Sequence, residues 1–129
     1  MAEPAGQAWD LAKEAASLIA GLPAACTVLD SAGRLVYYNP YAASLLDRRP
    51  AYLGRDVRAF HQPGSQDKIS FILDCYRRGD FREFAWRGSR NGVEMAVHVT
   101  PWRAEGGWRG VLHVVSVVPA ADAAALISD

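Results

Sequence analysis

The side chains best suited to bind a metal ion or a haem are three histidines, His61, His98 and His113. His61 stands two residues before Pro63, and an imidazole beside an apolar pocket is a suitable axial ligand for haem iron. We expect His98 and His113 on neighbouring strands, side by side on the outer face of a sheet. A metal site there requires a further ligand, and Glu94 is four residues away along its strand. We therefore keep His61 as the candidate haem ligand and expect no metal site.

No arrangement typical of an enzyme active site is present. The sequence has no Gly-x-Ser-x-Gly motif, phosphate-binding loop or paired-carboxylate motif. Cys26 and Cys75 lack a second cysteine at metal spacing and are expected to be buried thiols in a reducing compartment. The aspartates are scattered over turns and helix ends, where carboxylates cap helices: Asp30, Asp47, Asp56, Asp67, Asp74 and Asp80. We expect a protein that is not an enzyme.

Composition narrows the class of protein further. The chain has 129 residues, half of them hydrophobic, which suits one domain with a real core. Fourteen basic and 14 acidic residues give zero net charge, whereas nucleic-acid binders usually carry a basic excess. No apolar stretch approaches the roughly 18 residues of a membrane span, and no signal peptide is evident. We expect a cytoplasmic protein that binds neither nucleic acid nor membrane.

Residues 6–20 form an Ala-rich segment that favours a helix, ended by Gly21 and Pro23. Its apolar side chains recur at helical spacing and require a covering surface. We expect this helix to pack against a second copy of the chain, which makes the protein a homodimer. The expected interface residues are Trp9, Ala12, Ala16 and Ile19.

The rest of the chain groups its elements as a hairpin, several short helices, one longer helix and three strands. The expected strands are 25–29, 34–38, 81–86, 93–102 and 108–118, with a strong hairpin signal at Asn91-Gly92. Asn39 and Pro40 suit the start of a helix over 41–46, and Ser65 suits the N-cap of a helix over 66–78. Grouped rather than alternating elements predict an α+β fold with a five-stranded antiparallel sheet and short helices on one face. Such an arrangement leaves a cavity between sheet and helices.

Three segments resemble the PAS family in order and spacing. "VLDSAGRLVYYNPYAASLL" resembles the first PAS hairpin and its Asn-capped helix, "LGRDVRAFHQPGSQDKISFIL" the central helices, and "GVEMAVHVTPWRAEGGWRGVLHVV" the last two strands. The central segment is closest to a subtype with His-x-Pro before the long helix. The resemblance implies an N-terminal flanking helix over 1–21, a PAS domain over 22–119 and a tail over 120–129.

The resemblance implies a sensory module of signal transduction. Such domains bind a small molecule between sheet and helices, or they dimerise, and they act on a partner protein. The expected pocket residues are Phe60, Ile69, Ile72, Leu73, Met95, Val97, Val99 and Leu112. The alternatives are a haem-based gas or redox sensor that uses His61, and a ligand-free interaction domain with a filled core.

A flavin is not expected. The light-sensing branch of the family carries a reactive cysteine two residues after the arginine of the Gly-Arg segment, and Val57 stands there. Met95 and Leu112 stand where that branch has amides. The Asp-x-Thr motif that couples many PAS domains to an output helix is also absent, because those positions read Val117-Val118-Pro119.

Overall fold

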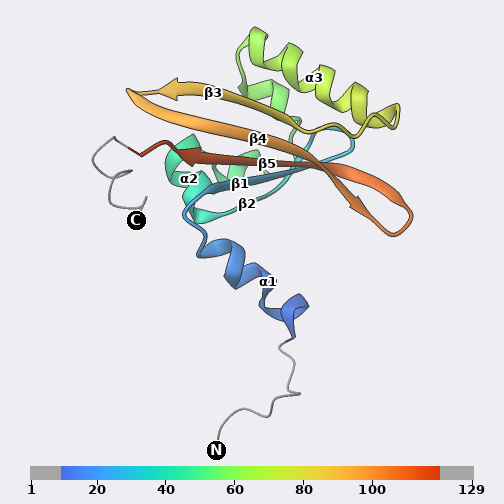
Figure 1. The fold of residues 1–129 in the computed structure, drawn as a ribbon, viewed down its shortest axis with the longest axis horizontal. Helices are drawn as coiled ribbons and strands as arrows, with labels where there is room; N and C mark the ends of the chain where they lie inside the picture. Colours follow the sequence, from blue (N-terminus) through green and yellow to red (C-terminus); the bar gives the residue numbers. More distant parts are fainter. Residues whose placement is uncertain (1–9, 120–129) are drawn as a thin grey trace, which may run out of the picture.

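A computed structural model describes residues 10–119, which form a five-stranded antiparallel sheet with helices on both sides (Figure 1). The strand order is β2-β1-β5-β4-β3. The α-helices are α1 (Leu11–Ala20), α2 (Pro40–Leu46) and α3 (Pro63–Arg77), and two 3-10 turns, η1 (Pro50–Tyr52) and η2 (Val57–Phe60), lie between α2 and α3. The strands are β1 (Ala25–Asp30), β2 (Leu35–Tyr38), β3 (Phe84–Arg90), β4 (Val93–Ala104) and β5 (Gly107–Val117). This confirms the expected α+β fold.

Two tight turns set the strand register. Asn91 and Gly92 both adopt positive φ, 52° and 77°, as the two-residue turn between β3 and β4 requires. In the first hairpin, the Asp30 carboxylate accepts hydrogen bonds from the backbone N–H groups of Ala32 and Arg34 at 3.0 and 2.9 Å. This Asx-type turn reverses the chain between β1 and β2.

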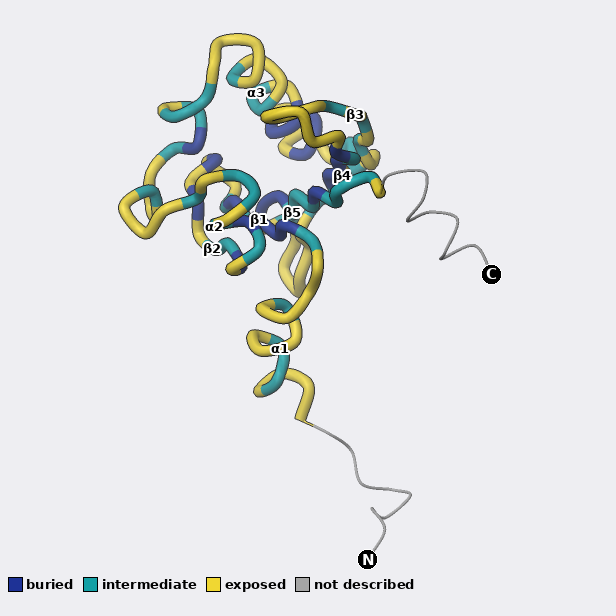
Figure 2. The backbone as a smooth tube through the Cα atoms, turned by 90° about the vertical axis from the view of Figure 1, so that its left-hand side faces the viewer, coloured by how far each residue is buried: buried dark blue, intermediate teal, exposed yellow. Residues whose placement is uncertain are grey.

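The core lies between the sheet and the layer formed by α2, η2 and α3 (Figure 2). Tyr76 of α3 is at its centre, 1% exposed, and its hydroxyl donates to the backbone carbonyl of Arg82 at 2.9 Å. The Tyr76 ring meets the rings of Phe84 and Trp108 at centroid distances of 6.0 and 6.2 Å. These contacts anchor the C-terminal half of α3 to the sheet, while Ser65, Lys68 and Ile69 of its N-terminal half border a cavity between the helix and the sheet.

Asn39 joins three elements with one buried side chain. Its Oδ1 accepts from the backbone N–H of Cys26 in β1 and of Ala42 in α2, at 2.9 and 3.0 Å. Its Nδ2 donates to the carbonyls of Ile19 and Ala24, at 3.0 and 2.9 Å. The expected helix cap is therefore confirmed, and the same amide also ties the end of α1 to the domain.

Helix α1 extends from the opposite side of the sheet to α2 and α3 (Figures 1 and 2). None of its described residues is buried. Ala12, Ala16 and Ile19 border an open groove whose other wall is the outer sheet face, including Val28 and Leu112. The apolar stripe of α1 is therefore only partly covered in one copy of the chain.

Two expected boundaries were wrong. Helix α3 begins at Pro63 with Gln62 as its N-cap, not at 66 with Ser65, because Pro suits the first helical turn. Strand β3 covers Phe84–Arg90 rather than 81–86, because the Asn91-Gly92 turn fixes its pairing with β4 from Arg90 back to Phe84. None of the helices in the described part of the chain is long and apolar enough to cross a membrane.

Candidate ligand cavity

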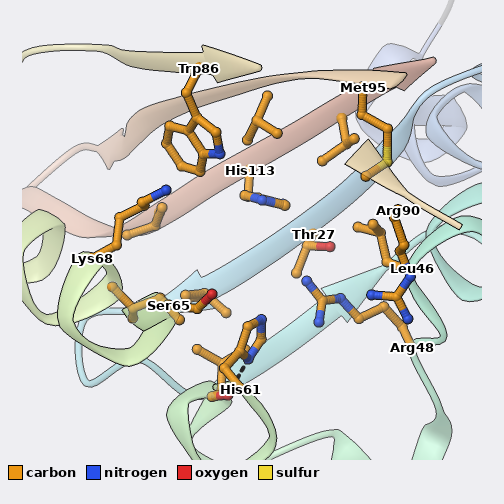
Figure 3. A pocket seen from close by; sticks show the side chains of 16 residues that line it. Thr27, Leu46, Arg48, His61, Ser65, Lys68, Trp86, Arg90, Met95 and His113 are labelled. Atoms are coloured by element: carbon orange, nitrogen blue, oxygen red, sulfur yellow. Dashed lines mark hydrogen bonds between the residues drawn. The ribbon is translucent and has the colours of Figure 1, made fainter. Parts of the chain in front are cut away.

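A cavity of about 200 Å³ lies between the inner face of the sheet and the layer of α2, η2 and α3 (Figure 3). Its apolar lining is Leu29, Leu46, Val57, Ile69, Trp86, Met95, Val97, Val111 and Val115. Its polar lining is Thr27, Arg48, His61, Ser65, Lys68, Arg90 and His113. The lining thus combines a mainly aliphatic surface with several nitrogen-bearing side chains.

The structure places the eight expected pocket residues in four different surroundings, the fourth of which, on the outer face of the sheet, holds Leu112. Ile69, Met95 and Val97 line the cavity. Ile72, Leu73 and Val99 are buried in the adjoining core and do not border it. Phe60 stacks on Tyr52 with ring centroids 4.2 Å apart and is not part of the cavity lining.

Leu112 is on the wrong side of the sheet for the expected pocket. It borders the groove beneath α1, while His113 lines the cavity. In an antiparallel pair, residues opposite one another share a face, and His113 pairs with Val99 and with Thr27. Alternation alone was ambiguous here, because both faces of β5 carry apolar residues.

The expected pairing of His98 with His113 was wrong for the same reason. His98 is opposite Val114 and exposed on the outer face, whereas His113 faces inward. Within residues 10–119, no group of three His, Cys, Asp or Glu side chains is placed to hold a metal ion. Cys26 and Cys75 are buried free thiols.

His61 follows η2, and its ring lies at the cavity wall. Its Nδ1 is 2.6 Å from the carbonyl oxygen of Val57. Because a carbonyl only accepts, Nδ1 carries the proton and the neutral ring presents Nε2 as an acceptor. Burial lowers the pKa of His61, and nearby Arg48 and Arg90 lower it further. The ring is therefore neutral at neutral pH.

His113 and Thr27 face each other across the β1–β5 pair and line the middle of the cavity (Figure 3). His113 Nδ1 and Thr27 Oγ1 are both shielded and make no hydrogen bond within the described residues. Burial, with a smaller contribution from Arg48, lowers the pKa of His113 to about 3. Shielded polar atoms without a partner are uncommon in folded proteins and point to a missing ligand or water.

Arg48 and Arg90 lie together at one end of the cavity (Figure 3). Asp47 ends α2 in the left-handed conformation, with φ 55°, and the chain then turns so that Arg48 lines the cavity. Arg90 ends β3 on the same face as Trp86, because the two are four residues apart on one strand. Burial lowers the pKa of Arg48, and the proximity of Arg90 adds to that effect, but a guanidinium keeps its charge in proteins.

Lys68 and Trp86 border the other end. The Lys68 ammonium nitrogen is 4.2 Å from the centroid of the Trp86 ring, a distance at which a cation is attracted to the ring face. Because Trp86 lines the cavity, its fluorescence is a natural reporter of what enters.

Sequence reasoning missed six of the polar lining residues: Thr27, Arg48, Ser65, Lys68, Arg90 and His113, the last of which was expected on the outer face. The period-2 alternation of β3 places Arg90 with Trp86 and was the one available signal for Arg90. For Arg48 the signal was the Asp-x-Arg pattern considered below.

A profile of the PAS domain family matches residues 16–117. The chain belongs to the PAS domain family. The match confirms the family resemblance of the three segments of this PAS domain. No curated protein matches the sequence closely enough to count as a relative.

Solved structures with the same fold span nearly the whole PAS domain. A C-terminal domain from Streptococcus mutans is 25% identical, with a TM-score of 0.72, over 89% of this chain and 90% of that one. The PAS domain of BvgS from Bordetella pertussis is 17% identical, with a TM-score of 0.66, over 90% and 92%. A sensory box sensor histidine kinase from Vibrio cholerae is 18% identical, with a TM-score of 0.60, over 85% and 96%. These likenesses concern the fold.

Proposed function

We propose that this PAS domain is a sensory module of signal transduction that binds a small ligand in the cavity and signals through dimerisation or a partner protein. The observation that carries the proposal is the cavity itself, with the shielded, unpartnered Thr27 Oγ1 and His113 Nδ1 on its wall. Ligand sites are typically concave, mostly apolar, and furnished with a few convergent polar groups. The structural likeness to a sensor histidine kinase supports the same role.

The competing view is an interaction domain with a filled core. A cavity of about 200 Å³ between the sheet and the helices disfavours it, because a filled core would leave no space of that size between these layers. The unpartnered polar atoms of the wall point in the same direction, since a purely structural core would satisfy them.

Native mass spectrometry of the freshly purified chain tests ligand binding. We expect a non-covalent adduct on the 14.0 kDa protein. Leu46→Phe places a larger side chain in the cavity and should abolish the adduct. Leu45→Phe, the matched control, adds the same ring at a residue outside this lining and should retain it. A bare mass for the natural chain would favour the ligand-free interaction domain.

Haem is the second candidate, because His61 presents Nε2 at the cavity wall. His61 would supply the axial ligand, and the bound group would add redox or gas-binding chemistry. The fit is poor in one respect: about 200 Å³ is below the roughly 300–1,000 Å³ of typical ligand pockets. An absorption spectrum of the same preparation with and without hemin separates the candidates. A Soret band lost in His61→Ala would support haem, and a flat spectrum would exclude it.

We further propose that the domain acts as a homodimer through α1. Of the four interface residues expected from the sequence, Trp9 lies outside the described residues. Ala12 and Ala16 are exposed and Ile19 is half-buried, so this stripe has room for a partner. Leu11 and Leu18 on the same helix are 64% and 57% exposed, which adds apolar area for burial.

Replacing Ile19 with aspartate should shift the protein toward monomer in sedimentation velocity, because the charge would have to be buried at the interface. Lys13→Asp, on an exposed part of the same helix, is the control and should leave the oligomer unchanged. An Ile19→Asp protein that remains a dimer would place the interface elsewhere.

A further inference from the structure

We propose that the ligand is a small carboxylate, with its anionic end held by Arg48 and Arg90 and its apolar part against the aliphatic wall of the cavity. This inference rests on the proposed ligand-binding function and names the chemical class of the ligand.

Arg48 is a shielded cation without a counterion in the described part of the chain. Its Nε is buried and makes no hydrogen bond. The ion pairs among residues 10–119 join Arg34, Arg49, Arg58, Arg77 and Arg82 to aspartates, and neither Arg48 nor Arg90 takes part. A desolvated charge destabilises the folded state unless it is paired and hydrogen-bonded. An anion that pairs with Arg48 in the cavity would therefore stabilise the folded chain.

A repeated Asp-x-Arg pattern shows that the inward position of Arg48 differs from its equivalents elsewhere in the chain. Three Asp-x-Arg triplets each form an ion pair between their first and third residues: Asp47 with Arg49, Asp56 with Arg58, and Asp80 with Arg82. The middle residues face the interior, and they are Arg48, Val57 and Phe81. In two triplets the inward residue is apolar, as packing requires, and in the third it is an arginine.

The charge balance of the cavity is one-sided. Its lining includes three cationic side chains, Arg48, Lys68 and Arg90, and no aspartate or glutamate. The pKa values of His61 and His113 are lowered, so both rings are neutral at neutral pH. The pKa of Asp47 is lowered mainly by the hydrogen bond that its carboxylate accepts from Arg49 at the surface. The charge of Arg90 makes a smaller contribution. No acidic side chain of the lining therefore faces the shielded Arg48, and an anion that pairs with it in the cavity would have to come from outside.

The wall selects a carboxylate with an apolar body. A planar guanidinium binds a carboxylate through two parallel hydrogen bonds. Beyond the arginines, Met95, Val97 and Val115 offer only aliphatic surface. A free phosphate would satisfy the arginines and leave this surface unfilled. The volume of about 200 Å³ suits an anion the size of hexanoate or benzoate.

Isothermal titration calorimetry at pH 7 with hexanoate and benzoate tests the inference, with hexanamide, benzamide and inorganic phosphate as comparisons. We expect each carboxylate to bind at least about tenfold more tightly than its amide, and phosphate to bind more weakly than either carboxylate. The tryptophan fluorescence of the chain should change with the same titration midpoint, because one of its four tryptophans, Trp86, borders the cavity.

Arg48→Gln should weaken hexanoate binding by about tenfold or more, and Arg48→Lys should rescue only part of it, because an ammonium lacks the planar fork. Arg49→Gln is the matched control: it removes a neighbouring arginine that is exposed and paired with Asp47, and binding should stay within about twofold. If Arg48→Gln fails to fold, Arg90→Gln carries the test, because Arg90 is exposed.

Three results would overturn the inference: amides that bind as tightly as carboxylates, phosphate that binds more tightly than either carboxylate, or variants of both arginines that bind hexanoate like the natural chain. The first and third would leave a ligand-binding cavity of another specificity, so the proposed function would stand. A chain that binds neither carboxylates nor amides and carries no adduct in the native mass spectrum would refute the proposed function as well.

Discussion

Replacing Gly110 with alanine should lower the free energy of unfolding by about 3 kcal/mol or more, at the upper end of what overpacking costs. Gly110 is buried in β5, opposite Asp30 of β1. A Cβ there would overlap the carbonyl oxygen of Leu29 and lie 2.9 Å from Cα of Asp30. Both are backbone atoms, so no side-chain rotation can relieve the overlap and β5 would have to separate from β1.

Chemical denaturation of Gly110→Ala and Gly88→Ala measures this effect against a matched control. Gly88 is also inside a strand, β3, but a Cβ there meets no atom within 4 Å. Gly88→Ala should therefore change stability by no more than about 0.5 kcal/mol. Equal stabilities for the two variants would show that β5 can shift away from β1 without loss. Because β5 carries Val111, His113 and Val115 to the cavity wall, we also expect Gly110→Ala to lose the ligand.

Acidification from pH 7 to pH 5 should lower the free energy of unfolding by about 2 kcal/mol through His113 alone. Burial lowers the pKa of His113 from 6.5 to about 3 in the folded chain. Between those values the unfolded chain binds a proton that the folded chain does not. The contribution of His113 to stability is therefore fully present above about pH 6.5 and is lost as the pH drops toward 3.

Urea denaturation of the natural chain and of His113→Gln, at pH 7, 6 and 5, isolates this contribution. His113→Gln should lose about 2 kcal/mol less over the same range. His98→Gln is the control, because His98 is exposed on the outer face, and it should keep the full pH dependence. The lowered pKa of His61 has the same sign and remains in both variants. The pKa values of Asp30, Asp47, Asp56 and Asp80 are lowered from 3.8, so those groups titrate below this window.

A His113→Gln variant with the pH dependence of the natural chain would mean that the His113 ring is not held neutral by burial. The acid sensitivity would then come from another titrating group, and His61 would be the first to test. Far-ultraviolet circular dichroism at pH 7 would confirm that the variant is folded before the comparison is made.

Local signals were sufficient for most of the fold. The residue types of Asn39-Pro40 favour a helix start, and those of Asn91-Gly92 favour a two-residue hairpin turn. The helix start and the turn are both where the sequence predicts them. Grouped strands and helices predicted the antiparallel α+β architecture, and the order of three segments predicted the PAS family. These inferences needed only neighbours in sequence.

The cavity wall depended on contacts between distant segments. Both faces of β5 are apolar, because one lines the cavity and the other faces α1, so alternation could not show that His113 points inward and Leu112 outward. Pairing with β1 and β4 decided it. Arg48 likewise stands beside a second arginine, Arg49, and the sequence alone does not show which of the two faces inward. Its inward position follows from the left-handed Asp47 and from the ion pair that holds Arg49 at the surface. The sequence alone determined the fold family, and tertiary pairing decided which charges face the ligand.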